Sequence, residues 1–303
     1  MTFDTSDIPA SPLEFILRQQ DGTELYIKRD DLVHPIIEGN KWRKLKYNII
    51  EVLQKEMKTI ISVGGAYSNH LLALSQAGKY YQFQTKGFVY GDYVDVHNFT
   101  LSSCLNNGME IVPLSKKEFL HIKEKGFSTR EYEYFVPEGG SNNLSFIGTG
   151  ELYAELIQQM PDLTHIVLPF GSGGTTAGIY QASLRSIEII AIPVLKLNPK
   201  QHLLKIFHRD FDALKSFDEY HFGGYAKFNQ TLLDFITSWH EKYSMVVDPI
   251  YNGKALFGLI EKLSHGYFPP YSKIVYIHTG GSQGIVGFNR RFNLNLPEKG
   301  MEI

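Results

Sequence analysis

Residues 164–184 read THIVLPFGSGGTTAGIYQASL, and this stretch decides the fold. The run of β-branched and other apolar residues at 164–169 predicts a buried strand. Glycines then interrupt the run, and residues 174–184 have helical periodicity. A strand that passes through a glycine turn into a helix is the repeating unit of a parallel sheet, so the stretch predicts an α/β fold.

The same alternation of strand and helix occurs on both sides of this stretch. Before it, we expect strands at 59–63, 86–90 and 109–114, with helices at 68–80, 97–106, 115–125 and 150–160. After it, we expect strands at 188–195 and 273–278. There is no repeat of fixed period and no low-complexity linker, so composition alone does not locate a domain boundary.

The composition limits the class of protein. With 303 residues, 43% of them hydrophobic, the chain is long enough for one large or two smaller domains. Its 30 basic and 32 acidic residues give a formal net charge of -2, without the long basic blocks that bind nucleic acid or anionic lipid. Cys104 is the single cysteine, which excludes an intrachain disulfide and a cysteine-based zinc site.

The sequence was also searched for targeting and membrane-spanning segments. Residues 1–10 lack the basic start and apolar run of a secretory signal, and no stretch is apolar and long enough to span a bilayer. We therefore expect a cytoplasmic protein that has no metal site and partners neither nucleic acid nor a membrane.

The segment GSGGTTAG, residues 171–178, predicts a phosphate site. Glycines let backbone N–H groups approach an anion closely, and the helix N-terminus adds the positive end of its dipole, so the loop can hold a phosphate without arginine or lysine. The spacing matches neither GxxxxGK[ST] nor GxGxxG. The structural alternative is a tight strand-to-helix turn that serves packing alone.

The segment GNKWRKLK, residues 39–46, contributes the candidate nucleophile Lys41. A lysine cluster is usually a solvated helix face. Here it follows KRDDL at 28–32 and accompanies a phosphate loop. A lysine in a partly desolvated pocket is a nucleophile toward an aldehyde, and the phosphate loop supplies the anchor that an aldehyde cofactor needs.

Two more segments place polar side chains at the ends of predicted strands. GGAYSNH, residues 64–70, contains Ser68 and Asn69, and IHTGG, residues 277–281, contains Thr279. The structural alternatives are an ordinary N-cap for Ser68, a turn residue for Asn69 and a buried hydroxyl bonded to nearby backbone for Thr279.

Six spaced motifs together resemble one enzyme family. KRDDL with GNKWRKL, GGAYSNH, PEGGSNN, GSGGTTAG, DPIYNGKA and IHTGG occur in this order over roughly residues 25–287. They resemble the pyridoxal 5′-phosphate (PLP) enzymes that include D-cysteine desulfhydrase and 1-aminocyclopropane-1-carboxylate deaminase, in the tryptophan-synthase β-like, fold type II group. The agreement of six motifs makes the resemblance specific.

The resemblance implies roles around the cofactor. Lys41 is similar to the Schiff-base lysine, and Asn69 to the residue that binds the cofactor's ring hydroxyl. Ser68 resembles the hydroxyl that contacts the substrate carboxylate or moves a proton, and Thr279 the residue beside the pyridine nitrogen. The implied phosphate loop consists of Gly171, Ser172, Gly173, Gly174 and Thr175.

Tyrosines are implied on the substrate side. Tyr251 resembles the tyrosine beside the ring, with a core aromatic as its structural alternative, and Tyr225 resembles a second active-site tyrosine. Tyr67 departs from the family, which commonly has glutamine there, and this change alters carboxylate recognition or crowds the pocket. The chain is also shorter than typical members.

Two positions bear on the reaction. Ring-opening deaminases of this family share glutamate after the tyrosine of DPxY and leucine before the last Gly-Gly pair, whereas desulfhydrases have small hydroxylated residues at both. In this chain Asn252 lacks the charge of that glutamate, and Thr279 is the residue of the desulfhydrases. The pair weakens the ring-opening interpretation and favours β-elimination from a D-cysteine-like amino acid to pyruvate, ammonia and sulfide. The alternatives are ring opening of 1-aminocyclopropane-1-carboxylate to 2-oxobutanoate and ammonia, a catalytically silent binder of PLP or a phosphometabolite, and a nucleotide-binding α/β protein that uses only the glycine loop.

The resemblance also implies the architecture. It implies two α/β domains with parallel sheets flanked by helices and the cofactor in the cleft between them. The large PLP-binding domain would comprise residues 1–45 and 137–303, and the small domain residues 46–136. A small amino acid is the implied substrate, and a homodimer the implied assembly.

Overall fold

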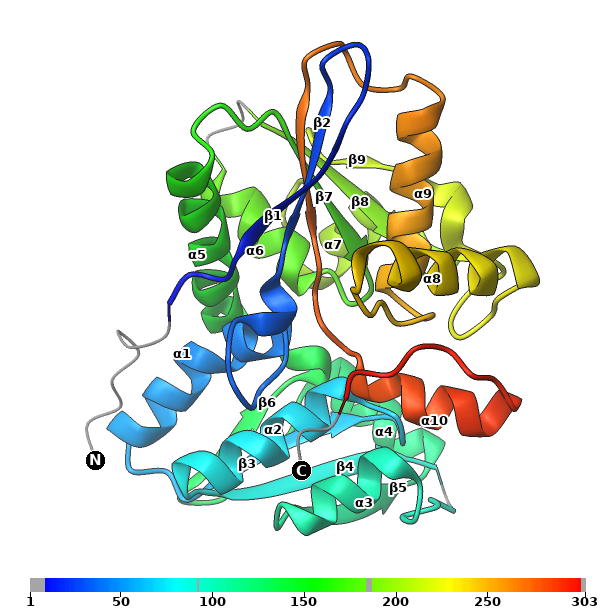
Figure 1. Cartoon of the computed structure of the whole chain (residues 1–303). Helices are drawn as coiled ribbons and strands as arrows, with labels where there is room; N and C mark the ends of the chain where they lie inside the picture. Colours follow the sequence, from blue (N-terminus) through cyan, green and yellow to red (C-terminus); the bar gives the residue numbers. More distant parts are fainter. Residues whose placement is uncertain (1–8, 92, 184–186, 301–303) are drawn as a thin grey trace.

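The strands of the protein form two separate sheets in a computed structural model that describes residues 9–91, 93–183 and 187–300 (Figure 1). One sheet has six strands in the order β1-β2-β10-β7-β8-β9, and the other has four in the order β5-β4-β3-β6. Neighbouring strands run parallel, except for the antiparallel pair of β1 and β2. The predicted α/β class with parallel sheets is confirmed.

The six-stranded sheet and its helices combine residues from both ends of the chain. Its strands are β1 (Leu13–Arg18), β2 (Glu24–Lys28), β7 (His165–Phe170), β8 (Glu188–Pro193), β9 (Lys215–Ser216) and β10 (Lys273–Ile277). Its helices are α5 (Asn143–Gln159), α6 (Gly174–Ala182), α7 (Pro199–Phe207), α8 (Gln230–Tyr243) and α9 (Asn252–Ser264), with short 3-10 turns at Asp30–Leu32 and Asp218–His221.

The four-stranded sheet is built from a continuous middle part of the chain. Its strands are β3 (Thr59–Gly64), β4 (Gln84–Tyr90), β5 (Glu110–Leu114) and β6 (Glu133–Val136). Its helices are α2 (Asn69–Tyr81), α3 (Phe99–Asn106) and α4 (Lys116–Lys125), and a 3-10 turn at Glu138–Gly140 follows β6. Helix α1 (Asn40–Gln54) enters this part from β2, and α10 (Gln283–Phe292) packs against α3 after leaving β10 (Figure 1).

Helices cover both faces of the larger sheet because its strands are apolar on both faces. Every residue of β7 is buried. Val167 packs with α8 and α9, whereas Ile166 and Leu168 pack on the opposite face with α5 and α6. Continuous apolar strands are typical of parallel sheets that are buried on both sides.

The expected strands and helices are present, and one boundary was wrong. The helix expected at 150–160 begins at Asn143, because the Asn142 side chain accepts a hydrogen bond from the Ser145 N–H and forms a capping box. Gly148 weakens the apolar pattern of this first part. A Cβ there would lie 2.0 Å from the Arg43 carbonyl oxygen, so glycine lets α5 approach α1. Residue 184, the expected end of α6, lies outside the described residues.

The topology brings the chemically distinctive loops to one region. The glycine loop follows the carboxyl end of β7, the segment with Ser68 follows β3, and Thr279 follows β10. Ligands of parallel α/β sheets bind at the carboxyl ends of the strands. Among the described residues, no helix is long and apolar enough to cross a membrane.

Candidate active site

A cavity of about 690 Å³ lies where these loops meet. Its lining includes nearly all of the residues proposed from the sequence, namely Lys41, Ser68, Asn69, Gly171, Ser172, Gly173, Thr175, Tyr225, Tyr251 and Thr279. Gly174 is not part of the lining and lies directly behind it, since a Cβ there would meet the Ser141 hydroxyl at 2.5 Å and the Lys44 ammonium at 3.0 Å. The structure therefore gathers the predicted residues in one place.

The glycine loop adopts a conformation that only small residues allow. Gly173 has a φ of +84°, and a Cβ there would lie 2.6 Å from Leu203. A Cβ on Gly171 would lie 2.8 Å from the Tyr251 ring. Because α6 begins at Gly174, its free N–H groups point toward the loop, as in helix N-termini that bind phosphate.

Lys44 adds a cation to this loop that the sequence prediction did not include. It is only 2% exposed, and its ammonium donates hydrogen bonds to the Gly139 carbonyl at 3.0 Å and to the hydroxyls of Ser141 and Ser172 at 3.2 Å each. All three partners are neutral, and no described carboxylate forms an ion pair with it. Burial, together with the charge of Lys41, holds the Lys44 pKa well below its usual value. A buried cation without a protein counter-charge favours a bound anion.

Lys41 lies in the first turn of α1 and is linked to the glycine loop through its neighbour. Its ammonium donates to the Asn40 side-chain oxygen at 2.7 Å, and the Asn40 amide donates to the Thr175 hydroxyl at 2.9 Å. Burial lowers the pKa of Lys41 to about 8, against the opposing charge of Asp248. This shift raises the fraction of the nucleophilic, neutral amine near neutral pH.

The backbone before Lys41 contacts the segment that contains Thr279. Gly39 has a φ of +65°, and a Cβ there would lie 2.1 Å from the Thr279 carbonyl oxygen. The Asn40 N–H donates to the same oxygen at 3.2 Å. This main-chain contact fixes the position of Lys41 relative to Thr279.

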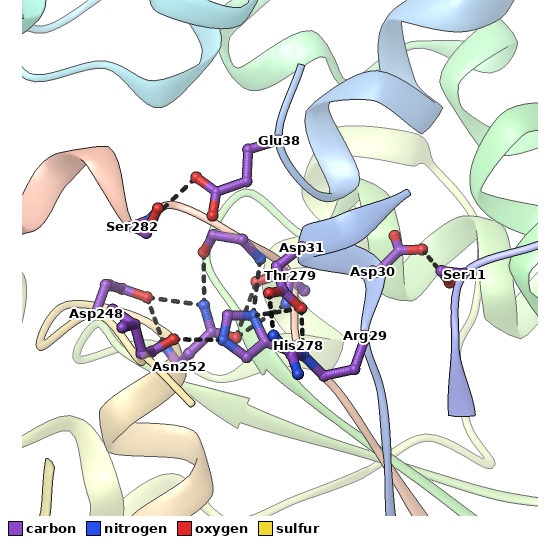
Figure 2. A network of polar contacts seen from close by, with 12 residues as sticks. Ser11, Arg29, Asp30, Asp31, Glu38, Asp248, Asn252, His278, Thr279 and Ser282 are labelled. Carbon is purple, nitrogen blue, oxygen red and sulfur yellow. Dashed lines mark hydrogen bonds and ion pairs between the residues drawn. The ribbon is translucent and has the colours of Figure 1, made fainter. Parts of the chain in front are cut away.

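Thr279 belongs to a buried polar cluster that is centred on Asn252 (Figure 2). The Asn252 amide donates to the Asp248 carboxylate at 2.8 Å and to the Gly280 carbonyl at 2.7 Å. Its oxygen accepts the Thr279 N–H at 3.0 Å and the Thr279 hydroxyl at 3.3 Å. The Asp248 carboxylate also accepts N–H groups of Ile250 and Tyr251, which fixes the first turn of α9.

Ser68 and Asn69 begin helix α2. The Ser68 hydroxyl accepts a hydrogen bond from the Leu71 N–H at 3.2 Å, so its predicted N-cap alternative is present, and the side chain also lines the cavity. Asn69 accepts from the Gln283 amide at 3.0 Å. Gln283, a second residue that the sequence did not suggest, therefore orients Asn69 from α10. Tyr67 is 41% exposed and lies beside Gly287, where a Cβ would meet its ring at 3.5 Å.

Tyr251 and Tyr225 lie together at the cavity. Their ring centroids are 6.2 Å apart in an edge-to-face arrangement. Burial raises the pKa of Tyr251 well above its usual value, and the Tyr225 phenol, the Asp248 charge and a hydrogen bond between the two phenols add to this effect. The Tyr251 phenol therefore stays protonated near neutral pH and can donate a proton or a hydrogen bond.

His70 lines the same cavity in a neutral form. It is 1% exposed, and its Nε2 lies 2.9 Å from the Ser62 hydroxyl, which donates to the Val136 carbonyl at 2.7 Å. Because that hydroxyl uses its proton on the carbonyl, Nε2 carries the imidazole proton. Burial and the charges of Lys41 and Lys44 lower the His70 pKa to about 3.

Comparison with known proteins decides the family. The model of a family described as pyridoxal-phosphate dependent enzyme matches residues 5–280. The chain belongs to this family. The predicted membership, the PLP cofactor and the identification as an enzyme are therefore confirmed. The buried, uncompensated Lys44, the glycine loop and the amine of Lys41 fit a cofactor with a phosphate and an aldehyde.

Individual relatives of this PLP enzyme cover nearly its whole length. It is 30% identical to a bifunctional D-cysteine desulfhydrase/1-aminocyclopropane-1-carboxylate deaminase of Arabidopsis thaliana, over 88% of this chain and 74% of that protein. It is 27% identical to a D-cysteine desulfhydrase of Salmonella typhi, over 92% and 94% of the two chains. A solved structure of a 1-aminocyclopropane-1-carboxylate (ACC) deaminase homologue is 25% identical to this chain and superposes on it with a TM-score of 0.78, with 94% of each chain covered.

Proposed function

We propose that this PLP enzyme is a lyase that releases pyruvate, ammonia and sulfide from D-cysteine or a closely related amino acid. The similarity to a D-cysteine desulfhydrase over most of both chains supports this reaction class. The arrangement of Asn252 and Thr279 supports β-elimination within the class. We further propose a large domain of residues 1–45 and 137–303 and a small domain of residues 46–136, and the presence of two separate sheets supports this division.

The residues around the cavity have distinct proposed tasks. Lys41 would hold the aldehyde carbon of the cofactor, and the glycine loop with Lys44 would hold its phosphate. Asn69, oriented by Gln283, would hold the ring hydroxyl. When bound, PLP supplies an electron-withdrawing ring that acidifies the bond between Cα and its hydrogen.

Proton transfer is assigned to the groups with suitable protonation states. Lys41 would be the base that takes the Cα proton, since its pKa of about 8 leaves part of the amine neutral at neutral pH. Ser68 and the N-terminus of α2 would bind the substrate carboxylate. Tyr251 keeps its phenol proton and would donate it on the substrate side of the ring.

The surroundings of Asn252 are the observation that carries the choice of reaction. Its amide nitrogen lies between the Asp248 carboxylate and the Gly280 carbonyl, at 2.8 and 2.7 Å, and both are acceptors. A carboxylate has no N–H, so an ionised oxygen in the place of this amide nitrogen would face two acceptors, which is unfavourable in a buried site. The glutamate that ring-opening deaminases have at this position therefore does not suit this pocket.

Ring opening of 1-aminocyclopropane-1-carboxylate is the second candidate. The name of the Arabidopsis thaliana relative includes both activities, and Tyr251 with Ser68 offers proton donors on the substrate side. The two candidates differ in product, because elimination gives pyruvate and ring opening gives 2-oxobutanoate.

A product assay separates the candidates. PLP-loaded wild type and Lys41→Ala would be incubated with D-cysteine and with 1-aminocyclopropane-1-carboxylate, and both 2-oxo acids would be quantified. We expect pyruvate from D-cysteine with the wild type only. Formation of 2-oxobutanoate alone would replace elimination by ring opening, and no product despite an intact cofactor absorbance band would support the silent binder. We further propose a homodimer in the cytoplasm, which sedimentation of the purified protein and cell fractionation would test.

A further inference from the structure

Three lysine or arginine side chains line the cavity among the described residues: Lys41, Lys44 and Arg291. The proposed function uses the first two, for the aldehyde and the phosphate of the cofactor. Arg291, near the end of α10, has no task in it. The α-carboxylate of an amino acid already has neutral donors at Ser68 and at the start of α2.

The face of α10 that lines the cavity explains how Arg291 reaches it. Gly284, Gly287, Phe288 and Arg291 all line the cavity and follow the spacing of one helix face. A Cβ on Gly284 would lie 3.7 Å from the Asn69 side-chain oxygen, and one on Gly287 3.5 Å from the Tyr67 ring. The first turn of α10 thus lies beside Asn69 and the next beside Tyr67, so Arg291 stands further along, about 10 Å from Gly284 along the axis.

The direction of helical side chains places the guanidinium toward the site. Long side chains on a helix lean back over the preceding turn, and the residue four positions before Arg291 is Gly287. Glycine has no side chain there, and the Tyr67 ring lies beside it, so an Arg291 side chain that leans back passes next to Tyr67. The Arg291 guanidinium carbon lies 5.2 Å from the Phe292 ring centroid, and no described carboxylate forms an ion pair with it. A cation held on an aromatic face at a cavity mouth can accept an anionic ligand group.

We propose that Arg291 is a specificity residue that binds a second, distal anionic group of the substrate. This inference rests on the proposed function and narrows its substrate class to amino acids whose β-substituent carries a carboxylate or similar anion. The cavity has room for such a group, because its volume of about 690 Å³ is well within the range of sites for drug-sized ligands. Tyr67, where the family commonly has glutamine, would form the wall between the α-carboxylate and the distal group.

The test compares two isosteric substrates that differ only in charge. In S-carboxymethyl-D-cysteine and S-carbamoylmethyl-D-cysteine, elimination breaks the Cβ–S bond, the thiolate leaves with the electron pair, and water converts the remainder to pyruvate and ammonia. We expect wild type to prefer the carboxylate by about fivefold to tenfold in kcat/KM, with the preference falling as salt is added. Arg291→Met should bring the ratio close to one.

Arg290→Met is the matched control, because Arg290 is exposed like Arg291 and lies on the same helix, but does not line the cavity. It should keep the wild-type ratio. A wild-type ratio near one, or a ratio that Arg291→Met leaves unchanged, overturns the inference while pyruvate release still supports the proposed function.

A binding measurement decides the inference even if no pyruvate forms and the proposed function fails. PLP-loaded protein would be titrated with D-glutamate and D-glutamine, and the change of the visible cofactor band would give both affinities. Tighter binding of the carboxylate that disappears in Arg291→Met supports the distal site. Equal affinities in the wild type overturn it.

Discussion

Replacing Lys44 by methionine should affect the apo-protein and the PLP-loaded protein in opposite directions. The side chain is 2% exposed, and its three hydrogen-bond acceptors are neutral. The protonated form is therefore unfavourable in the apo-protein, which lowers the pKa of Lys44, and it becomes favourable when an anion binds. Methionine keeps much of the volume and removes the charge.

The size of the effect follows from the contacts that are lost. A hydrogen bond between charged groups contributes about 1.5–3 kcal/mol, so the affinity of Lys44→Met for PLP should fall by about tenfold to 150-fold. The free energy of unfolding of the apo-protein should stay level or rise by about 1 kcal/mol, since a desolvated amine without a counter-charge is removed. Fluorescence titration with PLP gives the affinity, and denaturant unfolding of the apo-protein gives the stability.

Lys46→Met is the matched control, because Lys46 lies on the same helix, pairs with Glu151 at 2.8 Å and does not line the cavity. Its PLP affinity should equal that of the wild type. The reasoning is refuted if Lys44→Met binds PLP within twofold of the wild type, or if its apo-protein loses more than about 2 kcal/mol of stability.

Three further predictions concern protonation, packing and proton donation. Because only the neutral amine reacts and the pKa of Lys41 is near 8, the rate of PLP binding should be about tenfold higher at pH 7 than at pH 6. The rate should level off above about pH 8.5. A rate that still rises steeply at pH 10 would contradict the lowered pKa. Gly148→Ala places a Cβ 2.0 Å from the Arg43 carbonyl oxygen and should cost about 1–3 kcal/mol in thermal unfolding, whereas Gly300→Ala, with nothing within 4 Å, should cost none. Tyr251→Phe should lower kcat about 100-fold with an unchanged melting temperature and cofactor band, and a kcat near wild type would remove Tyr251 from proton transfer.

The sequence predicts the parts of this molecule that are governed by local patterns. Strands such as β7 are continuous apolar runs, and the loops after β3, β7 and β10 contain glycines that mark their ends. The family resemblance of the six motifs then assigned loops that are far apart in the sequence, and that follow strands of two different sheets, to one site. The β1–β2 hairpin was not predicted, since β1 is only partly buried and lacks a regular alternation.

The residues that the sequence missed depend on contacts between distant segments. Gln283 orients Asn69 from a helix 214 positions later, and no local pattern indicates this pairing. The sequence could have placed Lys44 beside Lys41, because it lies three positions later and thus on the same helix face. What the sequence could not supply is its burial, which turns an apparently solvated lysine into part of the phosphate site.

The contact of Gly39 and Asn40 with the Thr279 carbonyl has a consequence for how the chemistry of this enzyme can change. Lys41 and Thr279, proposed for the two ends of the cofactor ring, come from opposite ends of the chain, yet the backbone alone sets their spacing. The distance between the two segments suits a flat ring, and because main-chain atoms set it, substitutions of side chains leave it unchanged. Residues at the edge of the cavity, such as Tyr67 and Arg291, can therefore be substituted to suit another substrate without a change in the position of the cofactor.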